Sequence, residues 1–152
     1  MEAVGAAASL TGILGFAGQA IDGIIQLRAF FKDVSLAPRR TGELLNNIES
    51  LSDTLSDIHK LITILGAKPK KELNPEAEFN TSILQFHVKA CVDDVVDWVK
   101  VTKKADPRSE KGLKAFFRKV KIAVDKSGFE EMGRKISSHQ QRIGISLSIL
   151  GR

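Results

Sequence analysis

Apolar side chains recur at alternating spacings of four and three residues over one central stretch of the chain. Polar Ser, Asp, Asn and Glu fill the positions between them. This alternation is typical of an α-helix that buries a single face against neighbouring helices. The apolar seam consists of Leu44, Ile48, Leu51, Leu55, Ile58, Ile62 and Leu65. The pattern therefore predicts a helix over residues 39–65.

Similar seams, separated by short polar loops, predict further helices after this one. Asn74-Pro75 and Asp106-Pro107 each combine a capping side chain with a proline suited to the first helical position. The predicted helices cover residues 75–104, 108–126 and 127–150. With an N-terminal helix over residues 1–32, we expect an all-α, up-and-down helical bundle of four long helices plus one short basic helix, the one over 108–126. The length, 152 residues, suits a single domain over residues 1–152.

The N-terminal helix differs from the others because its apolar residues surround it. The bulky ones are Leu10, Ile13, Leu14, Phe16, Ile21, Ile24, Ile25, Leu27, Phe30 and Phe31. A helix that is apolar on all sides is either buried in protein or lies in lipid. Two interpretations follow: a segment that seeks a membrane or a partner, and the central helix of the bundle. Both hold if the helix is buried at rest and released on activation.

The polar residues of this helix argue against a secretory signal peptide and against a permanent transmembrane span. A signal peptide begins with positive charge, whereas Glu2 is the only ionisable side chain before the apolar run. A permanent span needs about 20 strongly apolar residues. Here Ala and Gly dominate, and Thr11, Gln19 and Asp22 interrupt the run.

Three glycines, Gly12, Gly15 and Gly18, occupy every third position of the same helix. Each costs about 1 kcal/mol of helix propensity relative to alanine. Small residues at this spacing let two helix backbones approach closely. We therefore expect these glycines to serve close helix packing or conformational freedom.

Basic residues concentrate in one stretch, although the net charge is only +5. Residues 103–126 contain nine Lys or Arg against three Asp or Glu. Such a stretch can bind phosphates of lipid or nucleic acid, or can simply form a solvated helix face. Phe116 and Phe117 share an apolar stripe with Leu113 and Val120, which favours core packing over stacking on bases. We therefore do not expect nucleic-acid binding.

No pattern indicates an enzyme, a metal site or a cofactor. Asp93 and Asp97 share a helix face, as in magnesium-diphosphate motifs, but a solvated acidic face paired with Lys89 and Lys100 explains the spacing better. None of the three histidines lies four residues from another, as a helical metal site requires. His139 falls in a helix seam, where a histidine is more often a satisfied core or rim residue than a ligand.

The single cysteine, Cys91, excludes an internal disulfide, which suits a reducing compartment. It lies among apolar residues, and we expect a buried, inert thiol. His87 lies four residues before it, so a nucleophilic pair is geometrically possible, but nothing supplies an oxyanion hole.

Two segments of the chain resemble a known family. They are the N-terminal run Met1-Glu2-Ala3-Val4-Gly5-Ala6-Ala7-Ala8-Ser9-Leu10 with Gly12-Ile13-Leu14-Gly15-Phe16-Ala17-Gly18-Gln19, and the basic aromatic stretch Phe116-Phe117-Arg118-Lys119 with the helix ending at Leu150. In order and position they resemble the HeLo and HeLo-like N-terminal domains of fungal STAND proteins, which are NOD-like receptors. Those domains are similar in turn to the four-helix bundle of mixed-lineage kinase-like protein.

The resemblance implies a cell-death effector domain of a larger receptor, cytoplasmic at rest. On clustering, the N-terminal helix would leave the bundle and permeabilise the plasma membrane. Insertion would fall to Leu10, Ile13, Leu14, Phe16, Ile21, Ile24 and Ile25. Gly12, Gly15 and Gly18 would pack protomers together, and Lys114, Arg118, Lys119 and Lys121 would bind anionic headgroups. Asp22 departs from a simple lipid anchor, and a protein-interaction adaptor without membrane activity is the alternative.

Overall fold

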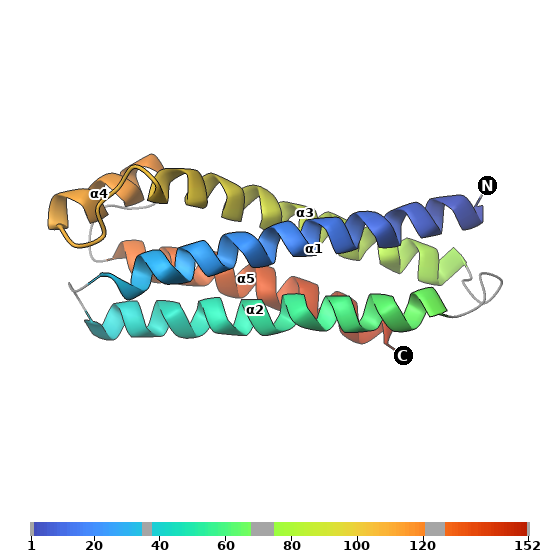
Figure 1. The fold of residues 1–152 in the computed structure, drawn as a ribbon. Coiled ribbons are helices and arrows are strands. Elements are labelled where there is room, and N and C mark those ends of the chain that lie inside the picture. The colour runs from blue at the N-terminus through green and yellow to red at the C-terminus, as the bar shows by residue number, and fades with distance from the viewer. Residues whose placement is uncertain (1, 35–37, 68–74, 121–126, 152) are drawn as a thin grey trace.

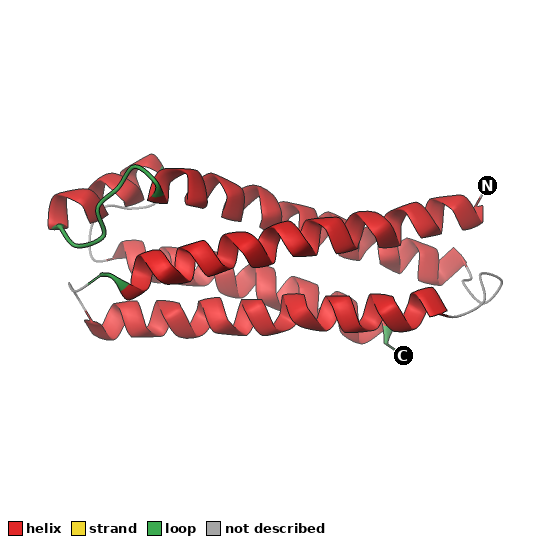
Figure 2. Ribbon diagram, in the orientation of Figure 1, coloured by secondary structure: helices red, strands yellow, loops and turns green. Residues whose placement is uncertain are grey.

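The structure, a computed structural model, describes residues 2–34, 38–67, 75–120 and 127–151. It contains five helices: α1 (Glu2–Lys32), α2 (Pro38–Ala67), α3 (Pro75–Thr102), α4 (Glu110–Lys119) and α5 (Ser127–Leu150). No strand occurs among the described residues, as Figure 2 shows. The predicted all-α class is therefore confirmed.

The four longer helices lie side by side around a common core (Figure 1). α1 packs against α2 and α3, and α5 packs against the same two helices. α1 and α3 run in the same direction, whereas α5 runs opposite to α3. The short α4 lies at the end of the bundle where α3 ends and α5 begins.

The predicted seam of α2 forms its buried face. Leu44, Ile48, Leu51, Leu55, Ile58 and Ile62 are all buried. The seam of α3 is buried as well, with Leu84, Val88, Cys91, Val95 and Trp98 in the core. Both helices keep their polar positions towards solvent, so one apolar face on each explains how they dock.

α1 buries its bulky side chains although its sequence is apolar all round. Ile13, Ile24 and Leu27 are fully buried. The outward face carries small or polar residues, among them Gly15, Gly18 and Asp22, which are exposed. α1 is thus one of four helices around the core, packed on two sides and open to solvent on a third.

The basic helix is shorter than the predicted range of 108–126, because α4 covers Glu110–Lys119 and residues 121–126 lie outside the described residues. Ser109, not Asp106, caps it: the Ser109 hydroxyl accepts a hydrogen bond from the Gly112 amide at 2.9 Å. Asp106 instead accepts from the Arg108 amide at 2.9 Å, which forms a turn before the helix. The other predicted boundaries differ from the observed ones by no more than two residues, and both ends of α5 coincide.

Candidate functional site

The seven residues assigned to membrane insertion do not share one surface of the resting bundle. Leu10, Ile13 and Ile24 are buried in the core. Leu14, Phe16 and Ile21 are half-buried and pack against it. Ile25 alone is largely exposed, at 49% of its surface. Insertion through all seven therefore requires α1 to leave the bundle.

The three predicted packing glycines occupy different environments. An added Cβ at Gly15 or Gly18 would have nothing within 4 Å, so both are open on the outer face of α1. An added Cβ at Gly12 would lie 2.9 Å from Nε2 of Gln85 on α3. Only Gly12 of the three thus faces a neighbouring helix at rest.

Gly23 is the glycine at which α1 and α3 approach most tightly, and the sequence analysis missed it. It is buried, and an added Cβ would lie closer than 3.0 Å to Cγ1 of Val95 on α3. Ala17 and Ala20, at the same three-residue spacing, are also buried. In the sequence, this repeat of small residues could have indicated the face on which α1 approaches a neighbouring helix closely.

Asp22, the only acidic residue in the apolar part of α1, lines a cleft between α1 and α3. The cleft has a volume of about 320 Å³. Lys100 and Lys103 of α3 line the same cleft, with Val96 and Val99 beside them. The carboxylate of Asp22 is therefore solvated and lies in a region of positive charge.

The basic face of α4 points to solvent. Lys114, Arg118 and Lys119 are exposed, and Lys114 pairs with Glu110 at 3.0 Å on the same helix. Lys121, the fourth predicted headgroup ligand, lies outside the described residues. Three of the four predicted cations therefore lie on one short, solvent-facing helix.

The opposite face of α4 joins a phenylalanine cluster made of Phe30, Phe31, Phe116, Phe117 and Phe129. Phe116 lies with its ring centre 4.8 Å from that of Phe30 and 5.6 Å from that of Phe31, both on α1. Phe117 lies 5.1 Å from Phe129 on α5. The core role expected for Phe116 and Phe117 is thus confirmed. Through this cluster α4 packs against the C-terminal end of α1.

A buried polar contact links α3 and α5. Nε2 of His139, which is buried, lies 2.6 Å from Oδ2 of Asp94. Nearby, burial lowers the pKa of His87 below its usual value, and the positive charge of Arg142 and the neighbouring His139 lower it further. His139 is therefore a satisfied, buried residue of the α3–α5 interface, as predicted.

The acidic face of α3 does not gather metal ligands. Asp93 pairs with Lys89 at 3.2 Å on the surface, as expected for a solvated face. Within the described ranges, no three His, Cys, Asp or Glu side chains come together as a metal site would require. In the described part of the fold, these carboxylates therefore do not meet around a common metal ion.

Cys91 should resist thiol reagents in the folded protein. It is fully buried, and burial, with the nearby Asp94 carboxylate, raises its pKa to about 12. Because the thiolate is the reactive form, we expect maleimide labelling only as fast as the protein unfolds. Mass spectrometry of labelling in increasing urea measures this. Rapid labelling of the native protein would contradict the buried position.

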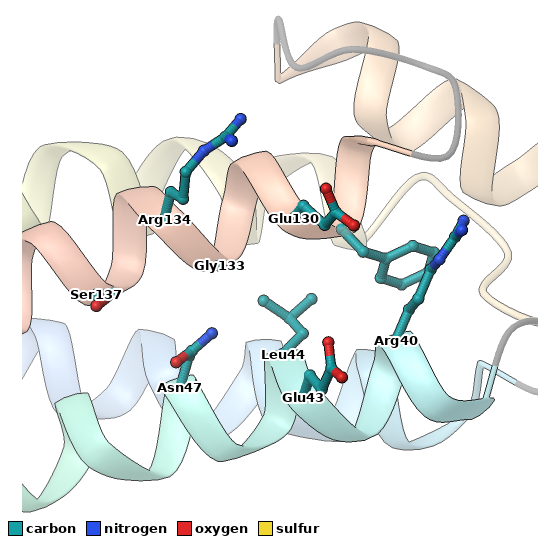
Figure 3. A pocket seen from close by; sticks show the side chains of 9 residues that line it. Arg40, Glu43, Leu44, Asn47, Glu130, Gly133, Arg134 and Ser137 are labelled. Atoms are coloured by element: carbon teal, nitrogen blue, oxygen red, sulfur yellow. The ribbon is translucent and has the colours of Figure 1, made fainter.

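A groove between α2 and α5 is a further hollow with polar walls (Figure 3). Its volume is about 300 Å³. Arg40 and Glu43 line it from α2, and Glu130 and Arg134 line it from α5. Two cations and two anions balance, so the groove has no preference for a charged ligand of either sign.

No protein-family model, no curated protein and no solved structure matches the chain. One described helical segment, Leu10–Lys32, is long and apolar enough to cross a membrane. Core helices of soluble proteins and signal sequences share that property, so length and composition alone do not decide the role of α1.

Proposed function

We propose that this chain is a membrane-permeabilising, oligomerising cell-death effector domain. In this proposal the chain is an up-and-down bundle of four long helices with one short basic helix. It is cytoplasmic at rest, belongs to or partners a larger receptor, and acts at the plasma membrane once clustered. One observation carries the proposal: α1 is long and apolar enough to span a membrane, yet its bulky side chains are held in the core of a bundle.

The energetics of α1 suit a helix with two environments. Burying a side chain such as Ile13, Ile24 or Leu27 stabilises the bundle by about 1.5–3 kcal/mol each. Their release into water would forfeit that stabilisation, whereas release into lipid would restore it. The bundle therefore retains α1 in solution, and a nearby membrane makes its departure less costly.

The outer face of α1 suits packing between protomers. Gly15, Gly18 and Asp22 lie three and four residues apart, so they share one face, which is open at rest. A carboxylate in hydrocarbon costs about 3 kcal/mol or more. If inserted helices pack through Gly15 and Gly18, Asp22 lies inside the assembly and not against acyl chains.

The basic helix supplies the first contact with the membrane in this proposal. Lys114, Arg118 and Lys119 of α4 would each gain about 1 kcal/mol near anionic headgroups. Lys121, which lies outside the described residues, would do the same. The phenylalanine cluster connects the other face of α4 to Phe30 and Phe31 of α1. A displacement of α4 on membrane binding would therefore also displace the C-terminal end of α1.

A protein-interaction adaptor without membrane activity is the second candidate. The observation that favours it is the exposure of Phe79 and Phe86 on α3, at 65% and 71% of their surface. Aromatic side chains dominate the energetics of protein interfaces, so these two exposed rings are available to bind a partner.

Dye release from vesicles of phosphatidylcholine, with and without phosphatidylserine, tests the membrane proposal. We expect release only with the anionic lipid. Ile25→Glu should reduce it roughly a hundredfold, because a charge in hydrocarbon costs about 3 kcal/mol. Ile25 is 49% exposed, so the bundle should tolerate the change. Ile64→Glu, on α2 and 58% exposed, is the matched control and should release dye like the wild type.

Three further variants complete the experiment. Replacing Lys114, Arg118 and Lys119 by glutamine should weaken vesicle binding, whereas the same change at the exposed Arg39, Lys60 and Lys89 should not. Gly23→Ala should loosen the α1–α3 contact. It therefore tests whether an absence of dye release arises only because α1 cannot leave the bundle. If even this variant releases no dye, the adaptor function replaces the membrane function.

A further inference from the structure

Three charged side chains line the cleft between α1 and α3, and they do not pair with one another. Asp22 lines it from α1, and Lys100 and Lys103 line it from α3. Among the described residues, none of the three forms an ion pair. Arg28, the next charged residue of α1, pairs instead with Glu49 of α2. Opposite charges therefore share the cleft but stay apart, which leaves space between them for a charged ligand.

The other charged residues of α3 near the cleft balance one another. Asp93 pairs with Lys89 at 3.2 Å, and Asp94 contacts α5 instead. Asp97 and Lys104 are both exposed and carry one charge of each sign. None of these five residues lines the cleft. The cleft itself has two positive charges and one negative charge, so it favours a ligand with two negative charges and one positive charge.

The remaining walls of the cleft suit a small polar ligand. Gln19 and Gln26 of α1 contribute amide groups. Nε2 of Gln26 donates to the main-chain oxygen of Asp22 at 3.5 Å, which leaves the amide oxygen of Gln26 available as an acceptor. Val96 and Val99 form the apolar part of the wall. The volume of about 320 Å³ lies at the small end of the range for ligand pockets.

We propose that this cleft binds a phosphodiester of serine, the group that phosphatidylserine carries as its headgroup. At neutral pH this group has a negative phosphate, a negative carboxylate and a positive ammonium. Lys100 and Lys103 would donate hydrogen bonds to the two anionic groups, and Asp22 would accept one from the ammonium. Hydrogen bonds between charged groups are shorter and stronger than those between neutral groups.

The combination of charges selects this ligand over simpler phosphates. Phosphatidylglycerol has no positive group, so its negative charge would lie near Asp22 without compensation. The phosphodiesters of ethanolamine and choline have only one negative charge, which leaves one of the two lysines without a partner. The quaternary ammonium of choline also has no N–H group to donate to Asp22.

Binding at this cleft would hold α1 in the bundle. One wall comes from α1 and the other from α3, so the cleft exists only while the two helices are docked. A ligand that binds only the docked form stabilises it. The site therefore does not depend on the proposed membrane function. If that function holds, the same contact would keep the intact bundle at the membrane surface before α1 inserts.

Calorimetric titration of the full chain with dihexanoyl phosphatidylserine, below its critical micelle concentration, tests the site. We expect saturable binding of one molecule per chain. Lys100→Gln and Lys103→Gln should each weaken it roughly tenfold, because each removes one hydrogen bond between charged groups. Lys104→Gln, at an exposed lysine outside the cleft, is the matched control and should bind like the wild type. Circular dichroism shows that each variant remains folded.

Asp22→Asn tests the match between the charges of the cleft and those of the ligand. It should weaken binding of dihexanoyl phosphatidylserine roughly tenfold, because the ammonium loses its anionic partner. It should strengthen binding of dihexanoyl phosphatidylglycerol, which has no ammonium. Asp53→Asn, at an exposed site on α2, should change neither affinity.

Glycerophosphoserine, the same headgroup without acyl chains, identifies the source of the ligand. Binding as tight as that of the lipid assigns the cleft to the serine phosphodiester itself, free or in a lipid. Much weaker binding assigns it to the lipid, whose chains then contribute. No saturable binding of either compound, or binding that Lys100→Gln and Lys103→Gln leave unchanged, overturns the proposal. Neither result depends on dye release, so the site and the membrane function can fail separately.

Discussion

Replacing Phe116 by alanine is expected to lower the free energy of unfolding by about 4 kcal/mol. Phe116 is fully buried and lies at the centre of the phenylalanine cluster, in ring contact with Phe30, Phe31 and Phe117. Its loss removes apolar burial and leaves a cavity between α1 and α4. Urea unfolding followed by far-UV circular dichroism measures the change.

The matched control for this prediction is Phe86→Ala, which removes the same side chain from an exposed position. At dilute protein it should change the free energy of unfolding by less than about 0.5 kcal/mol. If the proposed function is right, Phe116→Ala should also release dye at lower protein concentration, because it loosens the C-terminal end of α1. Equal losses from the two substitutions would show that the cluster does not hold the bundle together.

Gly23→Ala is expected to lower the free energy of unfolding by about 2 kcal/mol, although alanine is the better helix former. The added methyl group would lie closer than 3.0 Å to Cγ1 of Val95, so α1 and α3 must shift apart. Urea unfolding of the variant measures the effect.

Two comparisons separate this clash from a general effect of glycine replacement. Gly18→Ala, where an added Cβ has nothing within 4 Å, should leave stability unchanged or raise it by up to about 1 kcal/mol. Combining Gly23→Ala with Val95→Ala should destabilise the bundle by less than the two single losses added together, since the second change removes the clashing methyl group. A gain from Gly23→Ala like that from Gly18→Ala would rule out the close approach.

The helices that the sequence predicted best are those with a single apolar face. In α2, Leu44 through Ile62 follow one seam, so only one face can be buried and the helix can be placed from periodicity alone. The start of α4 was predicted wrongly because Asp106 and Ser109 can both cap a helix. The outcome depends on Gly112, whose lack of a side chain lets the backbone of Asp106 fold against it.

The sequence predicted which kinds of residue make up the candidate site, but not which of them contact one another. A helix that is apolar all round does not reveal which side turns inward, so the fit of Gly23 against Val95 could not be read from periodicity. The apolar stripe of Phe116 predicted its burial, whereas Phe31 lay on a helix whose buried side the sequence did not define. Their mutual contact joins residues far apart in the chain, which no local pattern encodes. Similarly, His139 was expected in the core or at its rim, but its partner Asp94 was not identifiable.

The pairing of α1 with α3 has a consequence for biosynthesis. The ribosome finishes α1 at Lys32 but completes α3 only at Thr102, 70 residues later. At about 5–20 residues per second, α1 waits several seconds for that partner. During this interval α2 alone can shield its apolar side chains. The nascent chain therefore exposes its most lipid-like segment early, and a chaperone that holds apolar helices would find it there.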